Sequence, residues 1–312
     1  MKRRVVKHGP ATLTVSLPKK WVDTFHIQNG QEIDVTEDGQ SLIISASAHH
    51  IKKQVTLSID SLDRTLLMYT IRGYYRYGVD ELTLNFKQPT LNYGRSSTKQ
   101  TVKSIVEQEL QRLMGFEVVH ESQNTITIRC VQQPTFSDFD TILRRIFLLL
   151  KISAKSLEKP MTTVALADIE QSHDQITKFV SYCLRVLNIS HHPDFHQTTY
   201  YYHTIGSLDR VMDFVKYAAR EINKKKISST AYEFISSTNK VIEGFYDFFF
   251  AFSLPDATKI NEKRYQLETA LSKASLSSRD MMICAKYSTI AELILDLVEA
   301  RMALEQKKLE VA

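Results

Sequence analysis

The stretch Arg4-Val-Val-Lys-His-Gly-Pro-Ala-Thr-Leu-Thr-Val-Ser-Leu-Pro-Lys-Lys-Trp-Val22 specifies how the N-terminal part of the chain folds. The Gly9-Pro10 pair marks a turn, and Leu13–Leu17 alternates apolar and hydroxyl side chains, which is the period of a half-buried strand. A short helix over 19–25 and a second hairpin over 32–44 follow. About 45 residues rarely form a stable core alone, so we expect a small β domain that dimerises.

The basic side chains of the chain are concentrated in the same segment. The first 20 residues carry six of them and no acidic ones, whereas the other 292 residues carry 34 basic and 35 acidic side chains. Lysine and arginine neutralise DNA phosphates, and arginine also reaches base edges. An isolated charge run is often only a solvated surface, but the absence of acids favours DNA. The predicted DNA-binding residues are Lys2, Arg3, Arg4, Lys7, His8, Lys19 and Lys20, where capping of the turn is an equal alternative for His8.

The overall composition indicates a globular protein with three separate cysteines. Hydrophobic residues make up 43% of the chain and charged residues 24%. Cys130, Cys183 and Cys284 form no CxxC pair, which argues against a disulfide framework or a zinc ribbon and favours a reducing compartment. No apolar run approaches the roughly 20 residues that span a bilayer. These features predict a soluble, cytoplasmic protein without membrane insertion.

The rest of the chain divides into an α/β part and an all-α part. We predict three domains, over 1–48, 51–133 and 136–312. The middle domain has the order strand, helix, strand, helix, strand, strand, with a polar loop over 87–97 and its second helix over 98–114. Long helical periodicity then predicts an antiparallel helical bundle. Its expected helices are 137–158, 163–188, 195–223, 228–252, 256–273 and 276–306.

The N-terminal stretch resembles the AbrB/SpoVT-type swapped-hairpin DNA-binding domain. The shared features are a basic strand, a glycine turn, the TxTVSLPKxWV core over 12–22, and a glycine, Gly30, before the second hairpin. The resemblance implies a dimeric β-barrel of interleaved hairpins that contacts DNA through its basic residues. Trp21 is then expected in the hydrophobic core of this barrel rather than on the DNA.

The helical part resembles the PhoU family of phosphate-uptake regulators. Leu208-Asp-Arg-Val-Met-Asp-Phe-Val-Lys-Tyr-Ala-Ala and Ile290-Ala-Glu-Leu-Ile-Leu-Asp-Leu-Val-Glu are similar to its acidic helices. The order of the parts resembles archaeal proteins that fuse an AbrB-type domain to a PhoU domain. Gln175 and Thr177 stand where the family carries further acids that help to hold metal clusters. We therefore predict no bound cofactor, although a metal ion at the remaining acids is an alternative.

Other clusters have a structural explanation that competes with the functional one. Asp209 with Asp213, and Glu292 with Asp296, could bind a metal or form an arginine-paired helix face. His191, His192, His196 and His203 lie around a proline without fixed ligand spacing, which favours a polar loop over a zinc site. The aromatic runs 200–202 and 248–250 are expected to pack between helices. No phosphate loop, nucleophile elbow or catalytic carboxylate pair is recognisable, so we do not expect an enzyme.

Together these observations predict a DNA-binding transcriptional regulator of phosphate homeostasis. It would form a homodimer or a higher homo-oligomer, with a PhoU-like bundle that receives a signal or binds phosphate transport or signalling proteins. The alternative is a PhoU-type adaptor that binds a phosphate transporter ATPase or a sensor protein and does not bind DNA.

Overall fold

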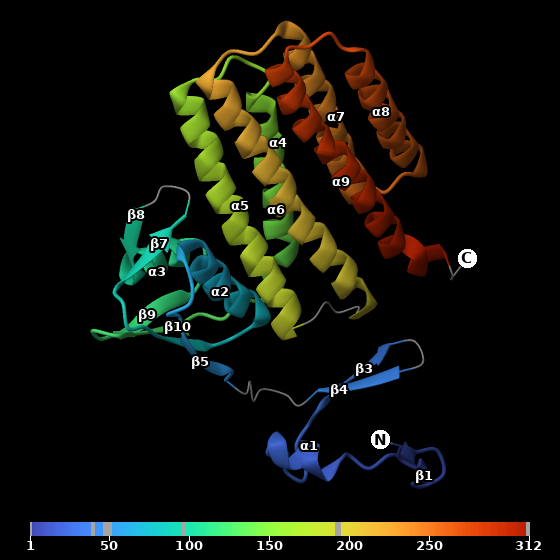
Figure 1. Ribbon diagram of the computed structural model, residues 1–312. Helices are drawn as coiled ribbons and strands as arrows, with labels where there is room; N and C mark the ends of the chain where they lie inside the picture. The colour runs from blue at the N-terminus through green and yellow to red at the C-terminus, as the bar shows by residue number, and fades with distance from the viewer. Residues whose placement is uncertain (1, 39–40, 46–51, 95–97, 191–194, 310–312) are drawn as a thin grey trace. The chain divides into compact units, whose positions relative to one another are not determined.

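The structure is a computed structural model that describes residues 2–38, 41–45, 52–94, 98–190 and 195–309 (Figure 1). The chain forms two compact units, and the boundary between them along the sequence lies between Lys52 and Lys53. The first unit is small and rich in β-strands. The second contains both the α/β layer and the helices, and each unit is described by itself.

The first unit consists of two hairpins and one short helix, as predicted. Its elements are β1 (Val6–Lys7), β2 (Leu13–Thr14), α1 (Lys19–Thr24), β3 (Asp34–Asp38) and β4 (Ser41–Ser45). β1 pairs with β2 and β3 with β4, both antiparallel. Gly9 has φ +81° and Gly30 has φ +80°, a conformation that glycine adopts without steric cost.

The described residues of the first unit include no buried side chain. Val6 is 59% exposed, Leu13 70% and Leu42 62%. A folded unit in which no described apolar side chain is buried lacks the burial that stabilises a domain. The single chain therefore presents apolar surface that a second copy would cover.

The second unit begins with a four-stranded sheet covered by helices. Its elements are β5 (Gln54–Ser58), α2 (Arg64–Tyr77), β6 (Glu81–Asn85), β7 (Thr90–Tyr93), β8 (Thr98–Thr101), α3 (Val102–Leu110), β9 (Phe116–Glu121) and β10 (Thr125–Cys130). The strand order is β5-β6-β10-β9, where β5 is parallel to β6 and the other pairs are antiparallel. Leu82 and Leu84 of β6 and Ile128 of β10 are fully buried, in one core with Ile71 of α2 and Ile105 of α3.

One part of this layer differs from the prediction. The expected polar loop over 87–97 contains β7, and the expected helix over 98–114 begins with β8, its antiparallel partner. α3 starts only at Val102, because the Thr101 side chain accepts a hydrogen bond from the backbone N–H of Ser104 and caps the helix there. Threonines at 90, 98 and 101 favour the extended conformation, and the prediction of a helix over 98–114 overlooked this local preference.

The C-terminal part is a bundle of long helices, as predicted. After a short 3-10 helix (Phe136–Asp138), the helices are α4 (Phe139–Ser156), α5 (Thr163–Ser190), α6 (Phe195–Lys224), α7 (Ser229–Phe250), α8 (Leu254–Lys273) and α9 (Ser278–Leu309). Successive helices run in opposite directions (Figure 1). Phe147 of α4 packs against Phe245 and Phe249 of α7, with ring centroids 5.7 and 5.0 Å apart. The 248–250 run therefore packs between helices, as expected. In the 200–202 run only Tyr201 packs against the core, whereas Tyr200 and Tyr202 are 39% and 40% exposed.

A buried arginine joins the α/β layer to the bundle. The guanidinium of Arg185 on α5 has no exposed surface and donates to the backbone oxygens of Tyr75 and Val79, both at 2.8 Å, and to Asp80 and Gln133. Layer and bundle therefore pack as one unit. The division into domains 51–133 and 136–312 stays a prediction.

A glycine lets the two parts approach closely at the same place. Gly78 ends α2 with φ +92°, and a Cβ there would lie only 2.6 Å from Cγ2 of Ile189 on α5. Any other residue would therefore combine backbone strain with a steric clash.

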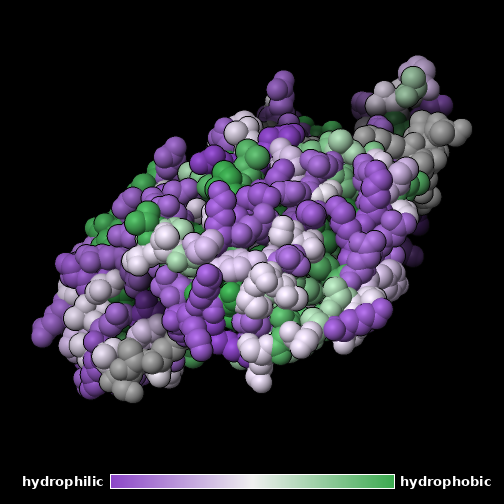
Figure 2. Space-filling view, turned by 90° about the horizontal axis from the view of Figure 1, so that it is seen from above, coloured by the Kyte–Doolittle hydropathy of each residue, from purple (hydrophilic) through white to green (hydrophobic). Residues whose placement is uncertain are grey.

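Hydrophilic residues predominate on the face of the molecule shown in Figure 2, where hydrophobic residues are scattered in small groups. Among the helices of the described ranges, none combines the length and apolar character needed to cross a membrane.

Candidate functional site

The seven residues predicted to bind DNA are all exposed in the first unit. Lys2, Arg3 and Arg4 precede β1, Lys7 ends this strand, and Lys19 with Lys20 begins α1. His8 lies in the turn between β1 and β2, where its backbone N–H donates to the oxygen of Thr12 at 2.8 Å. The backbone therefore closes this turn, and the imidazole is not needed for it.

Trp21 is half-buried in the single chain. Its ring centroid lies 5.5 Å from that of Phe25, at the other end of the same short helix. Two aromatic rings at the edge of a unit without a core provide apolar surface for pairing. The predicted place of Trp21 in the core of a dimeric barrel stays a prediction.

The acidic residues of α6 are engaged in ion pairs. Asp209 contacts Arg76 of α2 at 3.2 Å and accepts a hydrogen bond from Thr177 of α5. Asp213 lies 2.6 Å from Lys216 and 3.2 Å from His173. This is the paired helix face that was the alternative to a metal site, although its partners come from three different helices.

The second acidic motif and the histidines do not converge. Glu292 pairs with Arg264 of α8 at 2.8 Å, and Asp296 is exposed. His203 is exposed, whereas His191, His192 and the side chain of His196 lie outside the described residues. Across the described ranges, no three histidine, cysteine, aspartate or glutamate side chains gather closely enough to hold a metal ion.

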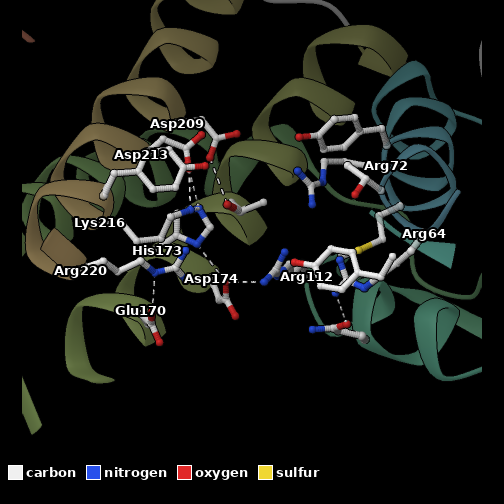
Figure 3. Close-up of a pocket in the computed structure, with 17 residues that line it drawn as sticks. Arg64, Arg72, Arg112, Glu170, His173, Asp174, Asp209, Asp213, Lys216 and Arg220 are labelled. Atoms are coloured by element: carbon white, nitrogen blue, oxygen red, sulfur yellow. Dashed lines mark hydrogen bonds and ion pairs between the residues drawn. The ribbon is translucent and has the colours of Figure 1, made fainter. Parts of the chain in front are cut away.

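A polar cavity of about 390 Å³ lies between the α/β layer and the bundle (Figure 3). α2, β7 and α3 form one wall, and α5 and α6 form the other. Charged side chains from both walls face each other across it, and the remaining lining consists of three tyrosines, Met68, Gln108 and two threonines. The charged and ionisable residues are Arg64, Arg72, Arg112, Glu170, His173, Asp174, Asp209, Asp213, Lys216 and Arg220.

His173 is at the centre of the bundle wall of this cavity. Nδ1 lies 3.0 Å from Asp174, and Nε2 lies 2.7 Å from Nζ of Lys216. Burial would lower the pKa of His173, but hydrogen bonds to Asp174 and Asp213 raise it above its ordinary value. Burial lowers the pKa of Lys216, and Asp213 offsets this only in part. Two basic groups in contact thus compete for the same carboxylate.

This cavity was not predicted from the sequence, although Asp209 and Asp213 were among the candidate residues. Arg64 and Arg220 lie on helices and Arg112 lies in the turn after α3. The three are far apart in the sequence, and nothing in their spacing indicates that they meet. The motif Glu170-Gln-Ser-His-Asp174 was the available signal, because charged residues there are spaced to line one helix face.

Comparison with known proteins identifies the N-terminal unit. Residues 8–53 match the family described as "Antidote-toxin recognition MazE, bacterial antitoxin". No curated protein and no solved structure matches the chain. The matched range ends at residue 53 and does not include the C-terminal helices. Residues 8–53 therefore form a MazE/AbrB-type swapped-hairpin domain, a class of domain that dimerises and binds DNA.

Proposed function

We propose that the protein is a DNA-binding transcriptional regulator whose helical part receives a signal. The observation that carries this proposal is the exposure of all six basic residues of an acid-free segment. Four of them directly precede the swapped-hairpin domain matched over residues 8–53, and Lys19 and Lys20 lie within it. In a two-fold dimer each of these side chains occurs twice. Such a surface supplies the counterion release that drives binding to duplex DNA. The proposal is of a binding protein rather than an enzyme.

We further propose that the signal concerns phosphate supply. The support is the resemblance of 208–219 in α6 and 290–299 in α9 to the acidic helices of PhoU proteins. Mapping of the protein's chromosomal sites with and without phosphate limitation tests this step. Occupancy that does not change with phosphate would contradict it and leave DNA binding intact.

Two pairs of adjacent lysines allow a matched test of DNA binding. Lys19→Ala/Lys20→Ala removes charge from the hairpin unit, and Lys225→Ala/Lys226→Ala removes the same charge from an exposed connection between α6 and α7. We expect only the first variant to weaken binding to duplex DNA. Its plot of log affinity against log salt should flatten by roughly 0.9 per lost phosphate contact. Equal slopes for both variants and the wild type would refute DNA contact by Lys19 and Lys20.

The adaptor function remains the competing hypothesis. It requires that a phosphate transporter ATPase or a sensor protein binds with little dependence on salt, while duplex DNA is not retained. Pull-down from cells and DNA binding by the same purified chain separate the two functions.

A further inference from the structure

The polar cavity between the α/β layer and the bundle is lined by more cationic than anionic side chains. Five carboxylates at or beside the cavity each have a basic partner. The pairs are Glu109 with Arg72 at 2.6 Å, Glu170 with Arg220 at 2.7 Å, Asp174 with Arg112 at 2.7 Å, Asp209 with Arg76 at 3.2 Å and Asp213 with Lys216 at 2.6 Å. Arg64 is the remaining cation, and within the described ranges no carboxylate pairs with it. The cavity therefore has an excess positive charge even before His173 is protonated.

Neutral partners hold Arg64 in place at the cavity. Its Nε donates to Gln100 at 2.5 Å and its Nη2 to Gln108 at 2.7 Å, and its guanidinium carbon lies 4.4 Å from the ring centroid of Tyr93. Two of the five N–H groups are used in these contacts. An arginine positioned by amides and an aromatic ring keeps its full charge and loses little side-chain freedom when an anion binds.

The opposite wall, formed by α5 and α6, holds two basic groups in contact beside one shared carboxylate. Lys216 is only 8% exposed and lies 2.7 Å from a nitrogen of His173, while Arg112 and Arg220 both disfavour its protonated form. Asp213 is the carboxylate that His173 and Lys216 share, and Asp174 is the second partner of His173. An anion in the cavity would add negative charge beside Lys216 and His173 and so favour the protonated form of both.

We propose that this cavity binds a small, multiply charged oxyanion between Arg64 and Arg112 of the α/β layer and Lys216 and Arg220 of the bundle. Its volume of about 390 Å³ lies within the roughly 300–1,000 Å³ of small-molecule sites. Arginine forks bind phosphoryl and carboxylate groups alike, so both chemistries fit. Figure 3 shows the cationic groups of the two walls on either side of one space.

This ligand would be the signal of the proposed regulator, and only in that respect does the inference rest on the proposed function. The site connects two layers that are separate in the sequence. A bound anion would hold the layer and the bundle together through charges on both sides, whereas the empty cavity keeps the excess positive charge. Binding itself requires neither DNA nor a dimer.

Titration calorimetry on the full chain at pH 7 tests the site with pyrophosphate, citrate and acetate at matched ionic strength. We expect saturable binding of pyrophosphate or citrate at one per chain, and none of the singly charged acetate. Preference for pyrophosphate assigns a phosphoryl ligand, and preference for citrate a polycarboxylate. The absence of saturable binding by both overturns the proposal.

Variants on the two walls locate the site. Arg64→Gln and Arg220→Gln should each lower the affinity by on the order of tenfold, because each removes a charge-assisted hydrogen bond. Arg145→Gln, on an exposed face of α4, is the matched control and should bind like the wild type. Wild-type affinity in both cavity variants would place the bound anion elsewhere and refute the assignment. Lys19→Ala/Lys20→Ala should still bind the anion, which separates failure of this site from failure of DNA binding.

Discussion

Replacement of Arg185 by methionine should cost the second unit much of its stability. The change removes the hydrogen bonds to the oxygens of Tyr75 and Val79 and leaves the carboxylate of Asp80 buried without its arginine. Loss of one partner of a buried ion pair costs about 3–5 kcal/mol, and each buried carbonyl that loses its donor costs about 1–3 kcal/mol. These contributions overlap, so we expect a loss of about 4–6 kcal/mol.

Urea unfolding of the full chain, followed by far-UV circular dichroism, measures this loss, because most helical residues lie in the second unit. Arg185→Lys keeps the charge without the planar fork and should lose about 2–3 kcal/mol, which provides a readable variant if the methionine form does not fold. Arg145→Met, on the surface of α4, is the control and should stay within about 0.5 kcal/mol of the wild type. Trp21 is the single tryptophan and lies in the first unit, so its fluorescence transition should not move. A loss below about 1 kcal/mol for Arg185→Met would show that the buried guanidinium does not join the layer to the bundle.

Three further predictions concern other parts of the chain. Arg4→Ala should flatten the slope of log DNA affinity against log salt by nearly 2, roughly 0.9 for each copy in the dimer, and an unchanged slope in salt-titrated binding would exclude a phosphate contact. Gly78→Ala should destabilise by about 1–3 kcal/mol in urea unfolding, because φ is +92° and the new Cβ meets Ile189, whereas Gly206→Ala in open space should be neutral or slightly stabilising; equal effects would contradict this. Burial alone would raise the pKa of Asp213, but hydrogen bonds to His173 and Lys216 outweigh burial and hold this pKa below its ordinary value of 3.8. The contribution of Asp213 to stability is therefore fully present above that pH and is lost as the pH falls below it. The difference in unfolding free energy between the wild type and Asp213→Asn should therefore shrink from pH 5 to pH 3, and a constant difference would refute the assignment.

Local signals account for the elements that the sequence predicted well. α5 and α6 begin within a residue of their expected starts, because prolines and polar breaks interrupt an otherwise continuous apolar periodicity. The hairpins of the first unit follow from alternation and glycine turns. The β7–β8 hairpin escaped prediction because most of its residues are polar, with Leu91 and Tyr93 as the exceptions, and because the pairing outweighs helical propensity over only the four residues of β8.

The packing of the α/β layer against the bundle could not be predicted, because its contacts join residues that are far apart in the sequence. Arg185 interrupts the apolar run Tyr182-Cys-Leu-Arg-Val-Leu187, and a lone arginine at such a position signals a buried partner without saying which one. Its acceptors lie more than 50 residues away. The same holds for Arg64 and His173, which the fold places around one cavity although no spacing relates them.

The lack of a core in the first unit affects how the amount of dimer depends on the concentration of the protein. Since the described strands expose their apolar side chains in a single chain, folding of this unit and association of two copies are one equilibrium. In the dilute regime the amount of dimer then grows with the square of the chain concentration. Occupancy of a DNA site would respond to synthesis of the protein more steeply than that of a monomeric binder. Halving the production of the protein would thus reduce the dimer about fourfold, without any change at the cavity.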